Sequence, residues 1–236
     1  MRRFDGKVIV VTGGSRGIGL AIAKACAAEG AQLVLAARER RTLAQAATQL
    51  PARPLAIAAD VTRPAQVARL FRRVRQEFGR VDVLIASAGA FTFRPFIRTS
   101  LADWRRNIES NLTSLYLTTR AALPLLERSR SPHIVNILSV SSKQAFANCS
   151  AYCASKFGAL GFTRVIAEEL RPKGIRVTAV LPGSTNTRMT REFGFPVNRA
   201  TLIQPEDVAA AVLAALLQPA RTTLDEVHLA PSRGAL

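Results

Sequence analysis

Short apolar runs rich in β-branched residues alternate with helical segments along the whole chain, and this alternation strongly constrains the fold. The runs lie at residues 7–12, 31–36, 54–59, 81–86, 134–138 and 175–181, with helical patterns between them, and a short strand is expected at 226–229. Strands joined through helices pair in parallel with right-handed crossovers. We therefore predict an α/β fold, a doubly wound parallel sheet of about seven strands with helices on both faces.

A glycine-rich segment joins the first predicted strand to the first predicted helix. Glycine permits a sharp backbone turn and the close approach of a pyrophosphate, and the helix directs its positive end at that group. The alternative is a plain tight turn, but the position in a βαβ unit favours dinucleotide binding. We predict a Rossmann-type phosphate site formed by Gly13, Ser15, Arg16, Gly17, Ile18 and Gly19.

The end of the second strand indicates which dinucleotide binds. An acidic residue there would bind the ribose 2′-hydroxyl of NAD, but the chain has Ala37 followed by Arg38. Arg16 in the glycine segment supplies a second guanidinium, and guanidinium groups pair with phosphate in a fork geometry. We therefore predict NADP(H) rather than NAD(H). The alternative is that Arg38 only faces solvent.

Tyr152 and Lys156 are the predicted centre of the chemistry. They are four residues apart, so a helix would place them on one face. An ammonium beside a phenol favours the phenolate, so we expect Lys156 to lower the phenol pKa toward neutrality and let Tyr152 act as an acid or base. Ser139 follows the fifth predicted strand. The alternative is that all three are ordinary turn or helix residues.

Composition excludes several other classes of protein. The net charge is +17, but the arginines are scattered without interleaved aromatic residues, so we expect no nucleic-acid partner. No apolar run reaches the roughly 20 residues that a membrane span needs, so we expect no membrane partner. The three cysteines and two histidines show no metal-ligand spacing, so we expect no metal. The N-terminus leads directly into the first strand, which predicts a cytoplasmic protein without a signal peptide, with one domain over residues 1–236.

Taken in order, these motifs resemble the short-chain dehydrogenase/reductase family along essentially the whole chain. Residues 182–187 are similar to the family's Pro-Gly-x-x-x-Thr motif at the nicotinamide end of the cofactor. The residues that match the family's catalytic tetrad are Asn111, Ser139, Tyr152 and Lys156. By this resemblance, the rest of the cofactor site comprises Asp60, Val61, Ser87, Ala88, Gly89, Tyr152, Lys156, Pro182, Gly183, Thr185 and Thr187. Ser87 departs from the asparagine that is usual in the family and that braces neighbouring strands.

The resemblance also implies a mechanism and a class of substrate. NADPH would deliver hydride to a carbonyl carbon while Tyr152 donates a proton to its oxygen and Ser139 orients that oxygen. Lys156 would hold the nicotinamide ribose, and Asn111 would hold a water. The substrate would be a small carbonyl or alcohol, such as a ketone, an aldehyde or a 3-oxoacyl thioester. The alternative is a non-catalytic NADP(H)-binding regulatory protein of the same fold.

Two further expectations concern surfaces. By resemblance, the helices that carry Asn111 and Tyr152 would pack against their copies in a homodimer or homotetramer, with Gly158 and Gly161 permitting close approach. An apolar wall over the nicotinamide is expected from Phe91, Phe93, Phe96, Phe146, Asn148, Met189, Phe193 and Phe195.

Overall fold

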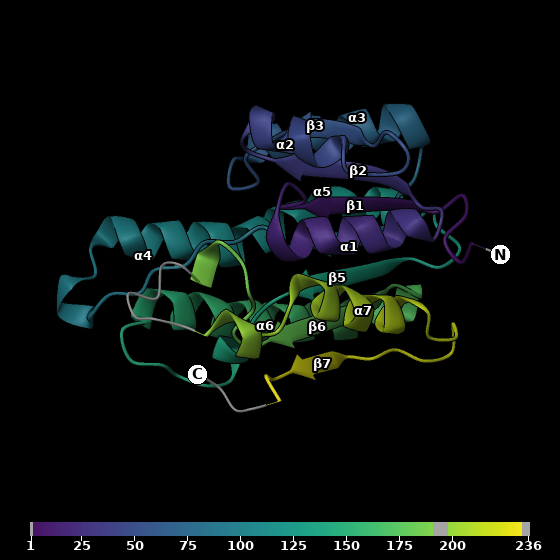
Figure 1. Cartoon of the computed structure of the whole chain (residues 1–236). Helices are drawn as coiled ribbons and strands as arrows, with labels where there is room; N and C mark the ends of the chain where they lie inside the picture. Colours follow the sequence, from purple (N-terminus) through teal and green to yellow (C-terminus); the bar gives the residue numbers. More distant parts are fainter. Residues whose placement is uncertain (1, 191–197, 233–236) are drawn as a thin grey trace.

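The computed structural model describes residues 2–190 and 198–232 and confirms the predicted α/β fold. Seven strands form one sheet in the order β3-β2-β1-β4-β5-β6-β7, and every neighbouring pair is parallel (Figure 1). The strands are β1 (Val8–Thr12), β2 (Gln32–Ala37), β3 (Leu55–Ala58), β4 (Val83–Ala86), β5 (His133–Ile137), β6 (Arg176–Pro182) and β7 (Glu226–Leu229).

Helices cover both faces of this sheet (Figure 1). Successive side chains of a strand point to opposite faces. Ile9 and Val11 of β1 therefore join one apolar layer, and Val8 and Val10 join the other. The first layer holds α1 (Gly17–Ala28), α2 (Arg40–Ala47) and α7 (Pro205–Leu216), and the second holds α3 (Pro64–Phe78), α5 (Ser114–Leu126) and the carboxyl-terminal part of α6 (Ser150–Leu170). No helix in the described ranges is long and apolar enough to cross a membrane.

The helical segment between β4 and β5 is divided. Helix α4 (Leu101–Ile108) is followed by a π-helical turn, η2 (Glu109–Thr113), before α5 begins. A π-helical turn holds one more residue than an α-helical turn and occurs often at functional sites. Asn111 lies in this turn.

The strand order reverses at β1, which pairs with β2 on one side and with β4 on the other. In open parallel sheets, ligands bind at the carboxyl ends of the strands beside such a reversal. The glycine segment, residues 87–89, Ser139 and Gly183 each follow the carboxyl end of a strand. The topology therefore brings the predicted site residues to one edge of the sheet.

Candidate active site

The glycine segment packs backbone to backbone against the residues that follow β4. Gly13 has a φ of +69°, and a Cβ there would lie 2.8 Å from backbone atoms of Ser87 and Ala88. A Cβ on Gly19 would lie 2.5 Å from the carbonyl oxygen of Gly13. Side chains are therefore excluded at both glycines. The backbone N–H of Ser87 also donates to the carbonyl of Thr12 at 3.2 Å, so two predicted cofactor segments are held together.

The N-terminus of α1 has unused hydrogen-bond donors. Arg16 is its N-cap residue, no described side chain caps the helix, and the first turn contains no acidic residue. The N–H groups of the first turn are therefore available to an anion, and the positive end of the helix dipole lies behind them. Ser15 and Ile18, the other predicted members, are partly exposed in this segment.

Residues 182–187 begin at the carboxyl end of β6 and form another side of the candidate site. The N–H of Gly183 donates to the carbonyl of Leu229 at 2.8 Å, and the Thr185 hydroxyl donates to the carbonyl of Gly183 at 2.9 Å. These bonds fix the segment after Pro182. Thr187 then reaches the glycine segment, because a Cβ on Gly17 would lie 3.3 Å from its Cγ2.

Asn111 joins the loop after β4 to the helix that carries Tyr152. Its Oδ1 accepts from the N–H of Ala90 at 2.8 Å, and its Nδ2 donates to the Ala90 carbonyl and to Ser155 Oγ, each at 2.9 Å. Ser155 Oγ in turn donates to the carbonyl of Tyr152 at 2.7 Å. A side chain on Gly89 would collide with this network, since its Cβ would lie 2.8 Å from Asn111 Oδ1. This bracing role, and Ser155 itself, were not predicted from the sequence.

Ser139, Tyr152 and Lys156 meet at the end of β5. Lys156 Nζ lies 5.7 Å from the centroid of the Tyr152 ring and donates to the carbonyl of Ile137 at 3.2 Å. The Ser139 side chain hydrogen-bonds the phenol, and its Oγ also accepts from the N–H of Ser141 at 3.1 Å. These three residues, like Asn111, are buried, with at most 8% of each residue exposed.

Burial controls the protonation of this cluster. It raises the pKa of Tyr152 to about 12, and the hydrogen bond from Ser139 only partly offsets that shift. The expectation that Lys156 brings the phenol pKa down toward neutrality is therefore wrong for this geometry, in which burial dominates. Burial also lowers the pKa of Lys156 to about 8, so the amine changes charge closer to neutral pH than the phenol does.

The predicted adenosine-side residues differ in how they are engaged. Asp60 Oδ1 accepts from the N–H and the hydroxyl of Thr62, at 3.0 and 2.8 Å, and Val61 is buried. Arg16 and Arg38 are exposed, and within residues 2–190 and 198–232 neither guanidinium has an ion-pair or hydrogen-bond partner. Both are available to bind a phosphate.

An apolar cluster borders the Tyr152 ring. Phe91 meets the ring edge-on, with centroids 4.8 Å apart. Burial raises the pKa of the Cys149 thiol to about 11, so it is neutral near pH 7. The cluster consists of Phe91, Cys149, Tyr152 and Cys153, with Phe93, Phe146 and Met189 packed against it.

The expected apolar wall is thus found in part. Phe96 does not belong to it, because its side chain projects from a short surface helix and is 82% exposed. Asn148 has a positive φ of 65°, a backbone conformation that asparagine adopts more readily than most residues, so it shapes the turn and is not part of an apolar wall. Phe193 and Phe195 lie outside the described residues.

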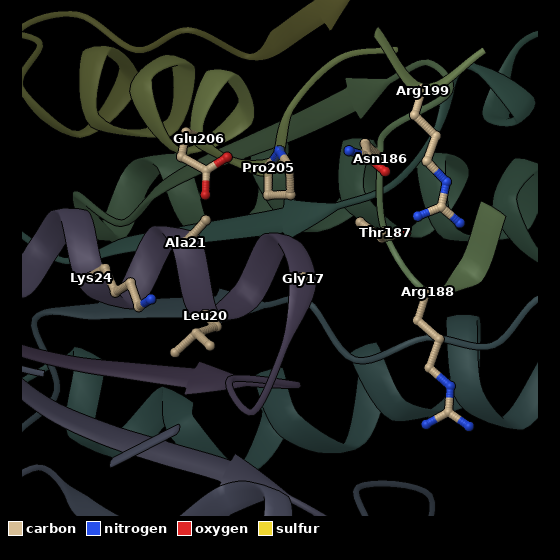
Figure 2. A pocket seen from close by; sticks show the side chains of 10 residues that line it. All are labelled: Gly17, Leu20, Ala21, Lys24, Asn186, Thr187, Arg188, Arg199, Pro205 and Glu206. Atoms are coloured by element: carbon tan, nitrogen blue, oxygen red, sulfur yellow. The ribbon is translucent and has the colours of Figure 1, made fainter. Parts of the chain in front are cut away.

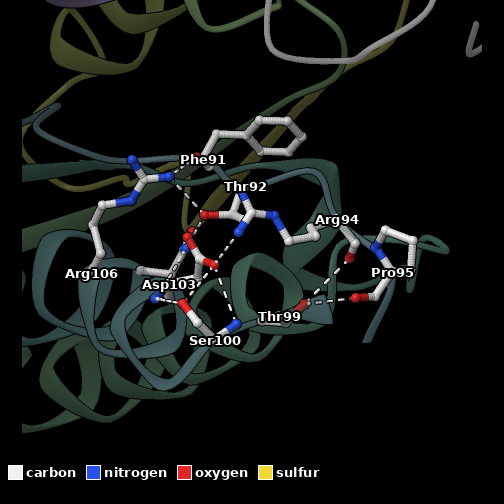
Figure 3. Close-up of polar contacts among 9 residues, drawn as sticks. Phe91, Thr92, Arg94, Pro95, Thr99, Ser100, Asp103 and Arg106 are labelled. Carbon is white, nitrogen blue, oxygen red and sulfur yellow. Dashed lines mark hydrogen bonds and ion pairs between the residues drawn. The ribbon is translucent and has the colours of Figure 1, made fainter. Parts of the chain in front are cut away.

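Polar contacts from α4 fix the position of Phe91 (Figure 3). Arg106 Nη2 donates to the Phe91 carbonyl and to Thr92 Oγ1, each at 2.8 Å. Asn107 Nδ2 donates to the same hydroxyl at 2.7 Å. Sequence reasoning missed these residues, because polar side chains on a helix give no signal that distinguishes a buried contact from a solvated one. In the described part of the chain, no group of three or more His, Cys, Asp and Glu residues is placed to hold a metal ion.

Comparison with known proteins gives one family. Residues 7–195 match the family described as short chain dehydrogenase. An uncharacterized oxidoreductase of Staphylococcus aureus strain MRSA252 is 34% identical over 226 residues, which cover 95% of this chain and 97% of that protein. An uncharacterized oxidoreductase of Staphylococcus saprophyticus is 31% identical over 235 residues, which cover 98% of this chain and 100% of that protein.

Solved structures with the same fold include two that are similar over nearly the full length. A metagenomic short-chain oxidoreductase in complex with NADP is 33% identical, with a TM-score of 0.85 and coverage of 97% of this chain and 98% of that chain. An alcohol dehydrogenase from the archaeon Thermococcus sibiricus, complexed with 5-hydroxy-NADP, is 29% identical, with a TM-score of 0.88 and coverage of 96% and 97%.

Proposed function

The chain belongs to the short-chain dehydrogenase family, and on that premise we propose that it is an NADP(H)-dependent oxidoreductase that interconverts a carbonyl and an alcohol. Both structural relatives described above were crystallised with NADP or a derivative of it. Arg38 follows the end of β2, where an acidic residue would favour NAD(H).

We further propose that residues 1–236 form one domain. A cytoplasmic location remains a prediction of the sequence.

The residues present fit a dinucleotide. The excluded side chains at Gly13 and Gly19 leave room for a diphosphate against the backbone, and the uncapped first turn of α1 supplies N–H donors. Arg16 and Arg38 have no ion-pair partner in the part of the chain that the structure describes, and both are suited to a 2′-phosphate. When bound, the nicotinamide ring supplies or accepts the hydride. The other residues proposed to hold the cofactor are Ser15, Gly17, Ile18, Asp60, Val61, Ser87, Ala88, Gly89, Tyr152, Lys156, Pro182, Gly183, Thr185 and Thr187.

In carbonyl reduction, Tyr152 donates its proton to the substrate oxygen. A phenol whose pKa is about 12 is protonated at neutral pH and so is in the donating form. Ser139, which hydrogen-bonds the phenol, would donate to the same oxygen. Lys156 stabilises the phenolate that remains, because its ammonium lies 5.7 Å from the ring centroid in a site from which water is largely excluded. General acid catalysis of this kind is worth roughly 10²–10⁴-fold.

The observation that carries this proposal is the burial of Lys156 beside Tyr152. A buried amine whose pKa is lowered to about 8 costs folding free energy, and an uncharged apolar side chain would avoid that cost. The alternative, a non-catalytic NADP(H)-binding regulator, does not require an ammonium at this position. The substrate classes to be tested are ketones, aldehydes and 3-oxoacyl thioesters.

The test is to measure dinucleotide binding and turnover in parallel. NADPH binding is followed by fluorescence, and NADPH oxidation is followed over a panel of ketones, aldehydes and 3-oxoacyl thioesters, with NADH as the comparison. We expect binding of NADPH and its oxidation by at least one class of carbonyl. Binding without oxidation across the panel would favour the regulator, and a clear preference for NADH would refute the role of Arg16 and Arg38.

We also propose a homodimer or homotetramer that assembles through α4, α5 and α6. Trp104, Tyr116 and Phe157, one on each helix, are 42–45% exposed, which is unusual for large aromatic residues. Gly161 has open space where a Cβ would lie, whereas Gly158, also expected at the interface, accommodates Leu112 of the same chain. Light scattering should give the mass of two or four chains, and a monomer would contradict the proposal.

A further inference from the structure

A cavity of about 340 Å³ lies between the first turns of α1, the start of α7 and the segment after β6 (Figure 2). Gly17 of the glycine segment lines it, together with Arg188 and with Arg199 of the short helix η6 (Arg199–Thr201). The cavity is therefore continuous with the N-terminus of α1, where the diphosphate of the cofactor is proposed to bind.

The charged residues of the cavity are mostly basic. Lys24, Arg188 and Arg199 line it, against one carboxylate, Glu206. All four are exposed, and among the described residues none of the three cations has an ion-pair or hydrogen-bond partner for its side chain. An electropositive cavity with unpaired cations is suited to an anion.

The two arginines lie on one side of Gly17. Figure 2 shows their guanidinium groups beyond the N-terminal end of α1, whereas Lys24 and Glu206 lie on the other side, along the helix. Arg188 also follows Thr187, whose methyl group lies 3.3 Å from the position of a Cβ on Gly17. The arginines thus border the same helix end that offers unused N–H donors.

We propose that Arg188 and Arg199 complete the diphosphate site of the cofactor. This inference rests on the proposed NADP(H) binding and extends it to residues that the sequence motifs do not include. The glycine segment supplies backbone N–H groups but no formal charge apart from Arg16, and a diphosphate carries about two negative charges. Two guanidinium groups from the segment after β6 neutralise that charge and donate charge-assisted hydrogen bonds.

The role predicts a distinct pattern of affinities. The diphosphate is common to NADPH and NADH, whereas the 2′-phosphate belongs to NADPH alone. Arg188→Met and Arg199→Met should therefore each weaken binding of both dinucleotides by the same factor, roughly 5- to 20-fold. Arg38→Met should weaken binding of NADPH and leave that of NADH nearly unchanged. Dissociation constants from isothermal titration supply the readout without requiring a substrate.

A matched control and two fragments sharpen the test. Arg221→Met removes one positive charge, that of an exposed arginine beside the amino end of β6, and the affinity for both dinucleotides should stay within about twofold of wild type.

ADP-ribose retains the diphosphate, whereas adenosine 2′-monophosphate lacks it. The Arg188 and Arg199 variants should weaken binding of ADP-ribose but not that of adenosine 2′-monophosphate.

Two results would overturn the inference while leaving the proposed function intact. One is unchanged affinity of both variants for NADPH and NADH. The other is a loss confined to NADPH, which would place the arginines on the 2′-phosphate. Wild-type protein that binds neither dinucleotide would instead refute the proposed function, and this assignment with it.

Discussion

Lys156 is the residue of the candidate site whose charge changes closest to neutral pH. Burial lowers its pKa to about 8 and raises the pKa of Tyr152 to about 12. Both shifts favour the uncharged form, as removal from water does. A protonated phenol is the form needed to reduce a carbonyl, and a protonated amine is needed to stabilise the phenolate left behind. Both conditions hold below about pH 8.

Carbonyl reduction should therefore slow as the pH rises through about 8. Lys156 is cationic below its pKa and neutral above it, while Tyr152 keeps its proton over the same range. The ratio kcat/KM, measured between about pH 6 and 10, should be level and then decline with one apparent pKa near 8. Lys156→Arg should abolish that decline in kcat/KM, because a guanidinium group keeps its charge over this pH range. A decline that begins only near pH 10 would contradict this assignment.

At the scale of elements, the π-helical turn η2 connects two parts of the site. It carries Asn111, which holds the loop after β4 through Ala90 and the start of α6 through Ser155. Gly89 leaves space for the Asn111 side chain, because a Cβ at Gly89 would lie 2.8 Å from Asn111 Oδ1. The arrangement makes the position of Tyr152 depend on a turn that lies 41 residues before it in the sequence.

Gly89→Ala should destabilise the protein through this connection. The new methyl group would lie 2.8 Å from Asn111 Oδ1, so the buried amide must move and lose hydrogen bonds. We expect a loss of about 1–3 kcal/mol in the free energy of unfolding, measured by chemical denaturation. A Gly89→Ala protein as stable as wild type would refute the clash.

The strands and most helices could be predicted because their signals are local. Most strands are short apolar runs bounded by turn residues, and the five inner strands are largely buried because helices cover both faces of the sheet. The π-helical turn could not be predicted in this way. Residues 109–113 carry no feature that distinguishes a π-helical turn from an α-helical one, and its place coincides with the contacts of Asn111 to Ala90 and Ser155.

At the scale of the whole molecule, His133 couples folding to pH. It is fully buried in β5, and its Nε2 lies 2.8 Å from Thr178 Oγ1 of β6. Burial, assisted by the charge of Arg176, lowers its pKa to about 3. The folded protein therefore keeps this imidazole neutral at pH values where the unfolded chain, with a pKa of about 6.5, binds a proton.

The free energy of unfolding should accordingly fall as the pH is lowered from about 6.5 toward 3. Between these values the unfolded chain binds more protons than the folded chain at this site, so stability rises with pH and the full contribution is present above about 6.5. Denaturation measured at several pH values should show a weaker acid dependence in His133→Gln than in wild type. Equal acid dependence of the two proteins would contradict this role.

The meeting of the site residues at one edge of the sheet could be expected from the sequence, but the direction in which their pKa values shift could not. Ser139, Tyr152 and Lys156 meet at one edge because each follows or flanks the carboxyl end of a strand. The burial that sets the pKa of Tyr152 depends on packing partners such as Phe91, which is 61 residues away in the sequence. Pairwise reasoning about Lys156 alone therefore gave the wrong direction of the shift.

The most direct test of proton transfer by Tyr152 is to remove its hydroxyl and measure binding and turnover separately. Tyr152→Phe keeps the ring that Phe91 contacts and removes the proton donor. The account predicts an NADPH dissociation constant within a few-fold of wild type and NADPH oxidation slower by at least about 100-fold. Oxidation at the wild-type rate by that variant would contradict it.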